Sequence, residues 1–162
     1  MLVLVCIDHR QTVLAGLIRT ASKKDVTPEV EESLFADLRL PWGGALEMNG
    51  RSVILQAGRK LPARIGEVLG RAGMAAADVE VFLVHQANKN LIDRVAQSLG
   101  VPADRFYCNI QRFGNTSSAS MPIAAAEYFE NRPMTARPAV FAAFGAGFHW
   151  GAILVESCGG WT

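Results

Sequence analysis

A histidine, an asparagine and a glycine-rich turn are the residues of this sequence that could do chemistry. His85 directly follows the apolar run Val81–Val84, Asn115 lies in the segment GNTSSAS at 114–120, and Gly145–Gly147 follows a third apolar run. An imidazole and a carboxamide can donate hydrogen bonds to a thioester or enolate oxygen, and the backbone of a glycine-rich turn can present an N–H to an oxyanion. The residues therefore allow stabilisation of negative charge that develops on an oxygen atom.

Each of these residues also has a purely structural interpretation. A histidine at the end of a strand often makes only structural hydrogen bonds, and asparagine is common in turns because it tolerates left-handed backbone geometry. The glycines are compatible with a tight connection, and Ser117–Ser120 with a helix cap made of small side chains. Spacing alone leaves the catalytic and the structural interpretation equally open.

The elements that would position these residues follow from the pattern of apolar side chains. Short apolar runs predict strands at 79–84, 106–110, 139–144 and 150–156. Helical spacing predicts a helix from Met48 to Gly70 or Gly73 with a kink or an interruption at Pro62, a second from 88 to 100, and a third from the 114–120 turn to about 130. This alternation predicts an α/β fold with a mostly parallel sheet, in which the three loops should meet at one edge.

The first 44 residues are less regular. Residues 1–7 and 12–19 predict a hairpin, and 29–38 predicts a short helix within a polar, irregular segment. A chain that begins inside an apolar strand is expected to start within a longer fold, because natural termini are usually polar and frayed.

Composition excludes several classes of function. The 162 residues suffice for one domain, and a net charge of +1 with acids and bases interspersed gives no basic stripe for nucleic acid or an anionic membrane. The longest apolar run is too short to span a bilayer and lacks the features of a signal peptide, which predicts a cytoplasmic location. Three widely spaced cysteines without a CxxC pair argue against disulfides and a zinc site, and we expect no metal and no cofactor.

Three segments in register resemble the C-terminal half of the β-ketoacyl-acyl-carrier-protein synthase III family, within the thiolase superfamily. They are HQAN at 85–88, GNTSSAS at 114–120 and FGAGFHWGAILVE at 144–156. The segment MNGRSV at 48–53 is similar to the start of that family's preceding helix, so the likeness covers roughly residues 45–156. The resemblance implies a single thiolase-like domain over 1–162, with helices packed on a mixed, mostly parallel five-stranded sheet.

The resemblance also implies roles for individual residues. His85 and Asn115 would hold the carbonyl of a malonyl thioester and stabilise the enolate left when carbon dioxide departs, and the backbone N–H of Ala146 would help to form an oxyanion hole. The implied pantetheine-binding positions are Gly50, Arg51, Ala87 and Asn88, and the implied carrier-protein docking positions are Lys89 and Arg94. The substrates would be an acyl-coenzyme A and malonyl-acyl carrier protein.

Some positions depart from the family pattern. Ala146 stands where the family usually has glycine, His149 where a small hydroxyl residue is common, and Arg51 where some members use asparagine. Asn90 occupies the usual position of the basic docking residue. We expect a packing role for His149.

The family's nucleophilic cysteine belongs to an N-terminal half that is expected to be missing. Cys6 falls on the first predicted strand, Cys108 in the middle of another, and Cys158 in a glycine-rich tail. None of them stands at a strand-to-helix turn, where a helix dipole would favour the thiolate, and we expect all three to be inert.

Two hypotheses from different classes follow. The first is the C-terminal catalytic half of a synthase in fatty acid or polyketide biosynthesis, inactive in condensation without the missing N-terminal half; an acyltransferase or ester-forming homologue remains open. The second is a non-catalytic thiolase-fold module that binds an acyl carrier protein or a partner subunit. In either case the half fold should expose apolar surface, which predicts a homo-oligomer or a partner.

Overall fold

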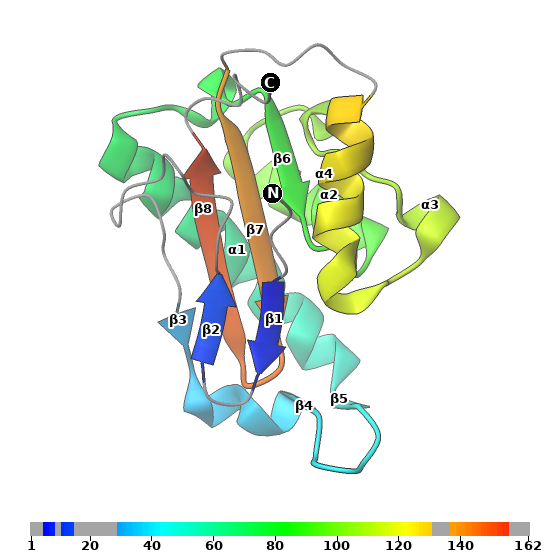
Figure 1. Cartoon of the computed structure of the whole chain (residues 1–162). Coiled ribbons are helices and arrows are strands. Elements are labelled where there is room, and N and C mark those ends of the chain that lie inside the picture. The colour runs from blue at the N-terminus through cyan, green and yellow to red at the C-terminus, as the bar shows by residue number, and fades with distance from the viewer. Residues whose placement is uncertain (1–4, 9–10, 15–28, 131–136, 156–162) are drawn as a thin grey trace.

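The main sheet of the protein has four strands in the order β3–β8–β7–β6 among the residues that our computed structural model describes, which are 5–8, 11–14, 29–130 and 137–155 (Figure 1). The strands are β3 (Glu29–Val30), β6 (Val81–Val84), β7 (Ala139–Gly145) and β8 (His149–Val155). β6 and β7 are parallel, whereas β7–β8 and β8–β3 are antiparallel. The carboxyl ends of β6 and β7 therefore lie at one edge, as predicted.

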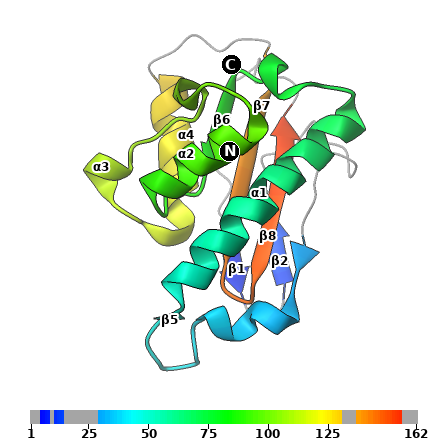
Figure 2. The ribbon, with the colours of Figure 1, turned by 180° about the vertical axis from the view of Figure 1, so that it is seen from behind.

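Helices cover both faces of this sheet (Figures 1 and 2). The helices are α1 (Gly50–Ala72), α2 (Lys89–Leu99), the short α3 (Ile110–Phe113) and α4 (Ser120–Glu130). Phe82 and Val84 of β6 are buried in one apolar cluster with side chains of α1 and α2, and Val81 and Leu83 are buried in a second cluster with side chains of α4. The period-2 alternation of β6 thus divides the core into two layers, which confirms the α/β fold class.

Helix α1 runs without a break through Pro62, so of the kink or interruption predicted there, the interruption is wrong. Its first turn is capped by Asn49, and it ends at Gly73, whose φ of 69° is the left-handed conformation that glycine adopts without strain. The residues buried along one stripe of the helix are Val53, Ala57, Leu61, Ile65, Val68 and Leu69. Since proline removes one helical hydrogen bond, the burial of this stripe outweighs that local cost.

The predicted strand at 106–110 is not formed. The described residues show only one isolated parallel bridge between Phe82 and Phe106, with the Tyr107 N–H donating to Phe82 O at 3.1 Å. The side chain of Gln86 donates to Tyr107 O at 3.2 Å and accepts from Asn109 N at 3.1 Å, so it occupies backbone groups that a longer ladder would need.

The sheet therefore differs in detail from the five-stranded, mostly parallel one that was expected. The fifth position next to β6 is reduced to the Phe106 bridge, and two of the three strand pairs are antiparallel. The turn from Gly145 to His149 is too short for a crossover connection, so β8 must return antiparallel to β7.

The remaining elements are small. The pair β1 (Val5–Asp8) and β2 (Gln11–Leu14) forms the predicted antiparallel hairpin within the described residues; the rest of the prediction, at 1–4 and 15–19, lies outside them. The predicted helix at 29–38 is instead β3 followed by the 3-10 helix η2 (Glu32–Asp37). The other short elements are β4 (Leu38–Arg39), β5 (Glu47–Met48), η3 (Ala76–Asp78), η4 (Ala103–Arg105) and η5 (Ser117–Ala119).

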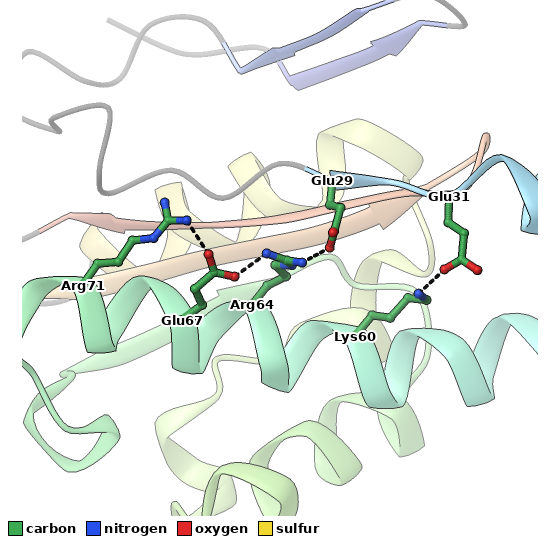
Figure 3. Close-up of polar contacts among 6 residues, drawn as sticks. All are labelled: Glu29, Glu31, Lys60, Arg64, Glu67 and Arg71. Atoms are coloured by element: carbon green, nitrogen blue, oxygen red, sulfur yellow. Dashed lines mark hydrogen bonds and ion pairs between the residues drawn. The ribbon is translucent and has the colours of Figure 1, made fainter.

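Ion pairs attach the edge strand β3 to helix α1 (Figure 3). Arg64 of α1 pairs with Glu29, and Lys60 of α1 pairs with Glu31 directly after β3. Arg64 also pairs with Glu67 one helical turn away. The two-residue strand β3 is thus held by ion pairs with α1 as well as by its short ladder with β8.

None of the helices described is long and apolar enough to span a bilayer.

Candidate active site at the carboxyl ends of β6 and β7

His85 is held by contacts with β7 and α4 at the edge where β6 and β7 end. Its backbone N–H donates to Ala142 O of β7 at 2.9 Å, and its ring lies edge-on to Phe144 with centroids 5.5 Å apart. Ring atom Nδ1 lies 2.6 Å from Oγ of Ser120, the first residue of α4. The ring therefore has a fixed orientation between the sheet and α4.

Burial keeps this imidazole neutral. Desolvation lowers the pKa of His85 from 6.5 to about 4, since the charged form loses its hydration. At neutral pH the ring carries one proton and is a neutral hydrogen-bond donor, which suits stabilisation of an oxyanion rather than general-acid chemistry.

Asn115 lies exposed in the turn that leads into η5 and α4. Its Oδ1 accepts a hydrogen bond from the Ser117 N–H at 3.0 Å, so the amide nitrogen is the end of the side chain left to donate to a ligand. No hydrogen bond joins Asn115 to His85 among the described residues; Ser120, which follows η5, contacts the His85 ring.

The glycine-rich turn closes the β7–β8 hairpin beside the same edge. His149 Nδ1 lies 2.6 Å from Ala146 O, and the Gly147 N–H donates to Leu38 O at 3.0 Å. Gly147 has φ 120°, and a Cβ there would lie 2.1 Å from His149 Nδ1, so glycine is required. The packing role expected for His149 is thus a hydrogen bond that closes the turn containing Ala146.

The implied pantetheine-binding residues lie at the N-termini of α1 and α2, two helices that pack against each other. Ala87 and Asn88 directly follow the His85 loop, and Asn88 Oδ1 caps α2 by accepting from Asn90 N and Leu91 N at 2.9 and 3.3 Å. Gly50 and Arg51 begin α1, and within the described residues no hydrogen bond links them to the His85 loop.

The implied docking residues lie on α2 and differ in their partners. Lys89 pairs with Asp93 one turn further along the helix. Arg94 is exposed and forms no ion pair with another described residue.

Sequence reasoning missed the buried polar residues that hold the site together. Gln86 is 0% exposed and bonds to the 107–109 segment. The sequence favours a helix cap for Ser120, but its hydroxyl group contacts His85. Asn109 is 2% exposed and donates to Glu127 on α4 at 2.9 Å. The one feature of the sequence that indicates such a network is Gln86, which lies between a buried strand and a helix cap. A buried amide without hydrogen-bond partners would be costly there.

Cys108 lies in the loop after Phe106 rather than in a strand. Its Sγ is 3.8 Å from Gln111 Oε1, so the thiol proton has an acceptor. Among the described residues, no cluster of three or more acidic, cysteine or histidine side chains could hold a metal ion.

The chain has the thiolase fold, with helices on both faces of a mixed sheet. Its structure closely matches those of solved proteins. It superposes on 3-oxoacyl-[acyl-carrier-protein] synthase III from Aquifex aeolicus with a TM-score of 0.78 and 34% identity, covering 82% of this chain and 43% of that one. The enzyme of the same name from Pseudomonas aeruginosa also gives a TM-score of 0.78, with 28% identity over 88% of this chain and 47% of that one.

Residues 69–157 match the family model described as 3-oxoacyl-[acyl-carrier-protein (ACP)] synthase III C terminal. The β-ketoacyl-[acyl-carrier-protein] synthase III of Oleidesulfovibrio alaskensis is 40% identical over 113 residues, which cover 69% of this chain and 34% of that protein. The chain belongs to the 3-oxoacyl-acyl-carrier-protein synthase III family. It spans about a third of the length of this curated relative and less than half of the solved structures.

Proposed function

We propose that this chain supplies the malonyl-binding part of a 3-oxoacyl-acyl-carrier-protein synthase III, and that His85 and Asn115 stabilise the enolate of the decarboxylative step. The observation that carries the proposal is the partly buried, neutral imidazole fixed at the carboxyl edge of β6 and β7. The free amide end of Asn115, whose oxygen is already bonded to Ser117 N, adds a second donor.

The proposed step begins with a malonyl thioester whose carbonyl oxygen accepts hydrogen bonds from His85 and Asn115. The bond between the α-carbon and the carboxylate breaks, carbon dioxide leaves, and the electron pair moves into the enolate, whose oxygen the two donors stabilise. The enolate carbon then attacks an acyl thioester on a cysteine and expels the thiolate. The N–H of Ala146 would stabilise the oxyanion formed in that attack.

The nucleophilic cysteine is proposed to come from an N-terminal half outside this chain. Cys108 does not suit the role because its thiol donates to Gln111 and stands at no N-terminus of a long helix. This chain alone should therefore not condense acyl thioesters. The pathway, whether fatty acid or polyketide, depends on an acyl pocket that the described residues do not define.

The test is decarboxylation of malonyl-coenzyme A, measured as acetyl-coenzyme A formed by the chain alone and after addition of the N-terminal half of a relative. We expect slow decarboxylation that both His85→Ala and Asn115→Ala abolish, while Ser118→Ala, in the same loop, leaves it unchanged. Condensation should appear only with the added half. Decarboxylation by His85→Ala at the rate of the unaltered chain would contradict the proposal.

Coenzyme A and the acyl carrier protein are the proposed partners. Their shared pantetheine arm would lie along Gly50, Arg51, Ala87 and Asn88 at the N-termini of α1 and α2. Of the two docking candidates, Arg94 has no ion pair with another described residue, whereas Lys89 is partly neutralised by Asp93. Arg94→Glu should therefore weaken carrier-protein binding more than Lys89→Glu, as measured by titration calorimetry at low salt.

A second candidate function is a non-catalytic module that binds a second copy or an N-terminal half. The observation that favours it is the apolar β4–β5 segment, whose Trp42 is 101% exposed. Leu40, Leu46 and Met48 in the same segment are about half exposed, which is unusual for a surface left in water. Under this alternative His85→Ala would leave partner binding unchanged and there would be no activity to lose.

A further inference from the structure

We propose that Ser120 is a positioning residue that fixes His85 in the tautomer protonated on Nε2. The inference deepens the proposed function, because only that tautomer presents an N–H on the ring nitrogen that α4 does not occupy. It rests on the hydrogen bonds around one buried hydroxyl group, and that part stands whether or not the chain takes part in catalysis.

The direction of the hydrogen bond between Ser120 and His85 follows from the other partner of the hydroxyl. The backbone N–H of Gln86 can only donate, and it lies 3.1 Å from Ser120 Oγ, so the hydroxyl oxygen accepts there. The hydroxyl proton then needs an acceptor of its own. Within the described residues the second polar partner of Oγ is His85 Nδ1, at 2.6 Å.

The opposite tautomer would leave a buried proton without an acceptor. If Nδ1 carried the proton and donated to Ser120, the hydroxyl oxygen would accept twice and its own hydrogen would have no partner among the described residues. Ser120 is 2% exposed, so water does not readily supply one. An unsatisfied buried donor is costly, and Nδ1 is therefore the acceptor and Nε2 the protonated atom.

The Gln86 N–H that sets this direction is itself held in place. The Gln86 side chain donates to Val84 O at 2.9 Å and accepts from Asn109 N at 3.1 Å. Asn109 in turn donates to Glu127 of α4, the same helix that Ser120 begins. The His85 loop thus contacts α4 in two ways: directly at Ser120, and through Gln86 and Asn109 at Glu127.

The protein contains its own reference for the measurement. His149 Nδ1 lies 2.6 Å from Ala146 O, and a carbonyl can only accept, so neutral His149 must be protonated on Nδ1. Two-dimensional ¹H–¹⁵N spectra of the imidazoles at neutral pH should therefore show opposite tautomers for the two residues, each assigned by its loss in His85→Asn or His149→Asn. A spectrum with His85 protonated on Nδ1 would overturn the proposal.

The variants test whether Ser120 is the cause. Ser120→Ala should remove the hydrogen-bond shift of the His85 Nδ1 resonance, Ser120→Thr should keep it, and the exposed Ser118→Ala should leave it unchanged. An Nδ1 resonance that is the same in Ser120→Ala and in the unaltered chain, with backbone spectra showing both folded, would also overturn the proposal. If Ser120→Ala does not fold, the tautomer of the unaltered chain and Ser120→Thr still decide it.

Activity separates this inference from the proposed function. With an added N-terminal half, Ser120→Ala should lower decarboxylation about 10- to 100-fold, less than loss of a direct oxyanion donor, and Ser120→Thr should restore most of it. The expected tautomer together with no decarboxylation by the unaltered chain would refute the function and leave the positioning role intact. Decarboxylation with His85 protonated on Nδ1 would refute the positioning role alone.

Discussion

Partial burial of His85 opposes the protonation of its own side chain. A histidine in water is half charged near pH 6.5, yet here its ring lies between Phe144 and the first residue of α4, where burial lowers its pKa to about 4. The fold must therefore keep the ring neutral, and the cost of doing so depends on pH.

The stability of the protein should fall in acid because of this residue. Between pH 6.5 and about 4 the unfolded chain binds a proton that folded His85 does not, so the free energy of unfolding decreases as the pH falls through that window. We expect a loss of about 2 kcal/mol between pH 7 and pH 5, from 1.36 kcal/mol per pKa unit. Urea unfolding at each pH measures it.

The matched comparison is between two histidines. His85→Asn should lose this part of the pH dependence, while His149→Asn should retain it. An equal pH dependence in the unaltered chain and in His85→Asn would show that other groups cause the loss.

Gln86 should contribute to stability as much as an apolar core residue. Gln86→Leu leaves the Asn109 N–H and the Tyr107 carbonyl without their partner in a buried place. We expect a loss of about 2–4 kcal/mol, because each unsatisfied buried group costs about 1–3 kcal/mol. The control Gln97→Leu lies on the exposed face of α2 and should change stability by less than about 0.5 kcal/mol. A loss for Gln86→Leu no larger than the control's would mean that water replaces the amide.

At the residue scale the sequence was enough to place His85 between a buried strand and a helix, because an apolar run ending in histidine before a capping asparagine is a local pattern. The supporting partners could not be found in this way. Ser120 is 35 residues from His85 and Asn109 is 23 from Gln86, and both contacts depend on how α4 and the 107–109 segment pack. Small polar residues in a turn, such as Ser120, are as typical of a helix cap as of a contact with a distant side chain.

At the scale of elements, the sequence pattern correctly predicts the helix ends, which depend on local residues. It wrongly predicts a strand at 106–110, whose backbone groups have a partner elsewhere in the chain. The ends of α1 and α2 at Gly73 and Gly100 agree with the predicted stops, because left-handed glycines end helices whatever surrounds them. The strand predicted at 106–110 does not form because the Gln86 side chain, which is distant in sequence, makes hydrogen bonds to the backbone of Tyr107 and Asn109.

The edge strand β3 should depend on its ion pairs with α1. The Lys60 hydrogen bond is the main cause of the lowered pKa of Glu31, and Arg64 holds Glu29 (Figure 3). Arg64→Met should speed hydrogen exchange of the Glu31 N–H, which donates to Phe148 O, about fivefold, the equivalent of about 1 kcal/mol.

Arg71→Met is the control for this experiment, because Arg71 pairs only within α1, with Glu67, among the described residues. It should leave the exchange of the Glu31 N–H unchanged. If Arg64→Met does the same, the short ladder with β8 holds β3 without help from α1.

Helix α2 combines a cap with a position implied to bind pantetheine. Asn88→Ala should lower the free energy of unfolding by about 1 kcal/mol, since Asn88 Oδ1 accepts from two backbone N–H groups of the first turn. Asn88→Asp keeps an accepting oxygen but loses the amide donor, so it should retain stability while weakening coenzyme A binding in calorimetry. If the Asn88→Asp protein is stable and binds coenzyme A as well as the unaltered chain does, Asn88 caps the helix and does not bind pantetheine.

At the scale of the whole molecule, the fold places His85 at the carboxyl edge of β6 and β7 and Asn115 in the turn before α4, and the described residues offer no activated thiol. Cys108 is the free cysteine of the described core, and its proton is directed to Gln111 rather than to a basic group. A thiolate is needed to attack a thioester, and the imidazole that could accept a proton is partly buried, neutral and bonded to Ser120.

Incubation with acetyl-coenzyme A should therefore leave the intact mass of the folded chain unchanged. An N-terminal half of a relative, added to the same mixture, should carry the acetyl group on its own cysteine. A stable adduct that peptide mapping locates on Cys108, and that Cys108→Ser removes, would mean that this chain has its own nucleophile. In that case the division of chemistry between two halves would have to be abandoned, even if His85 still stabilises the enolate.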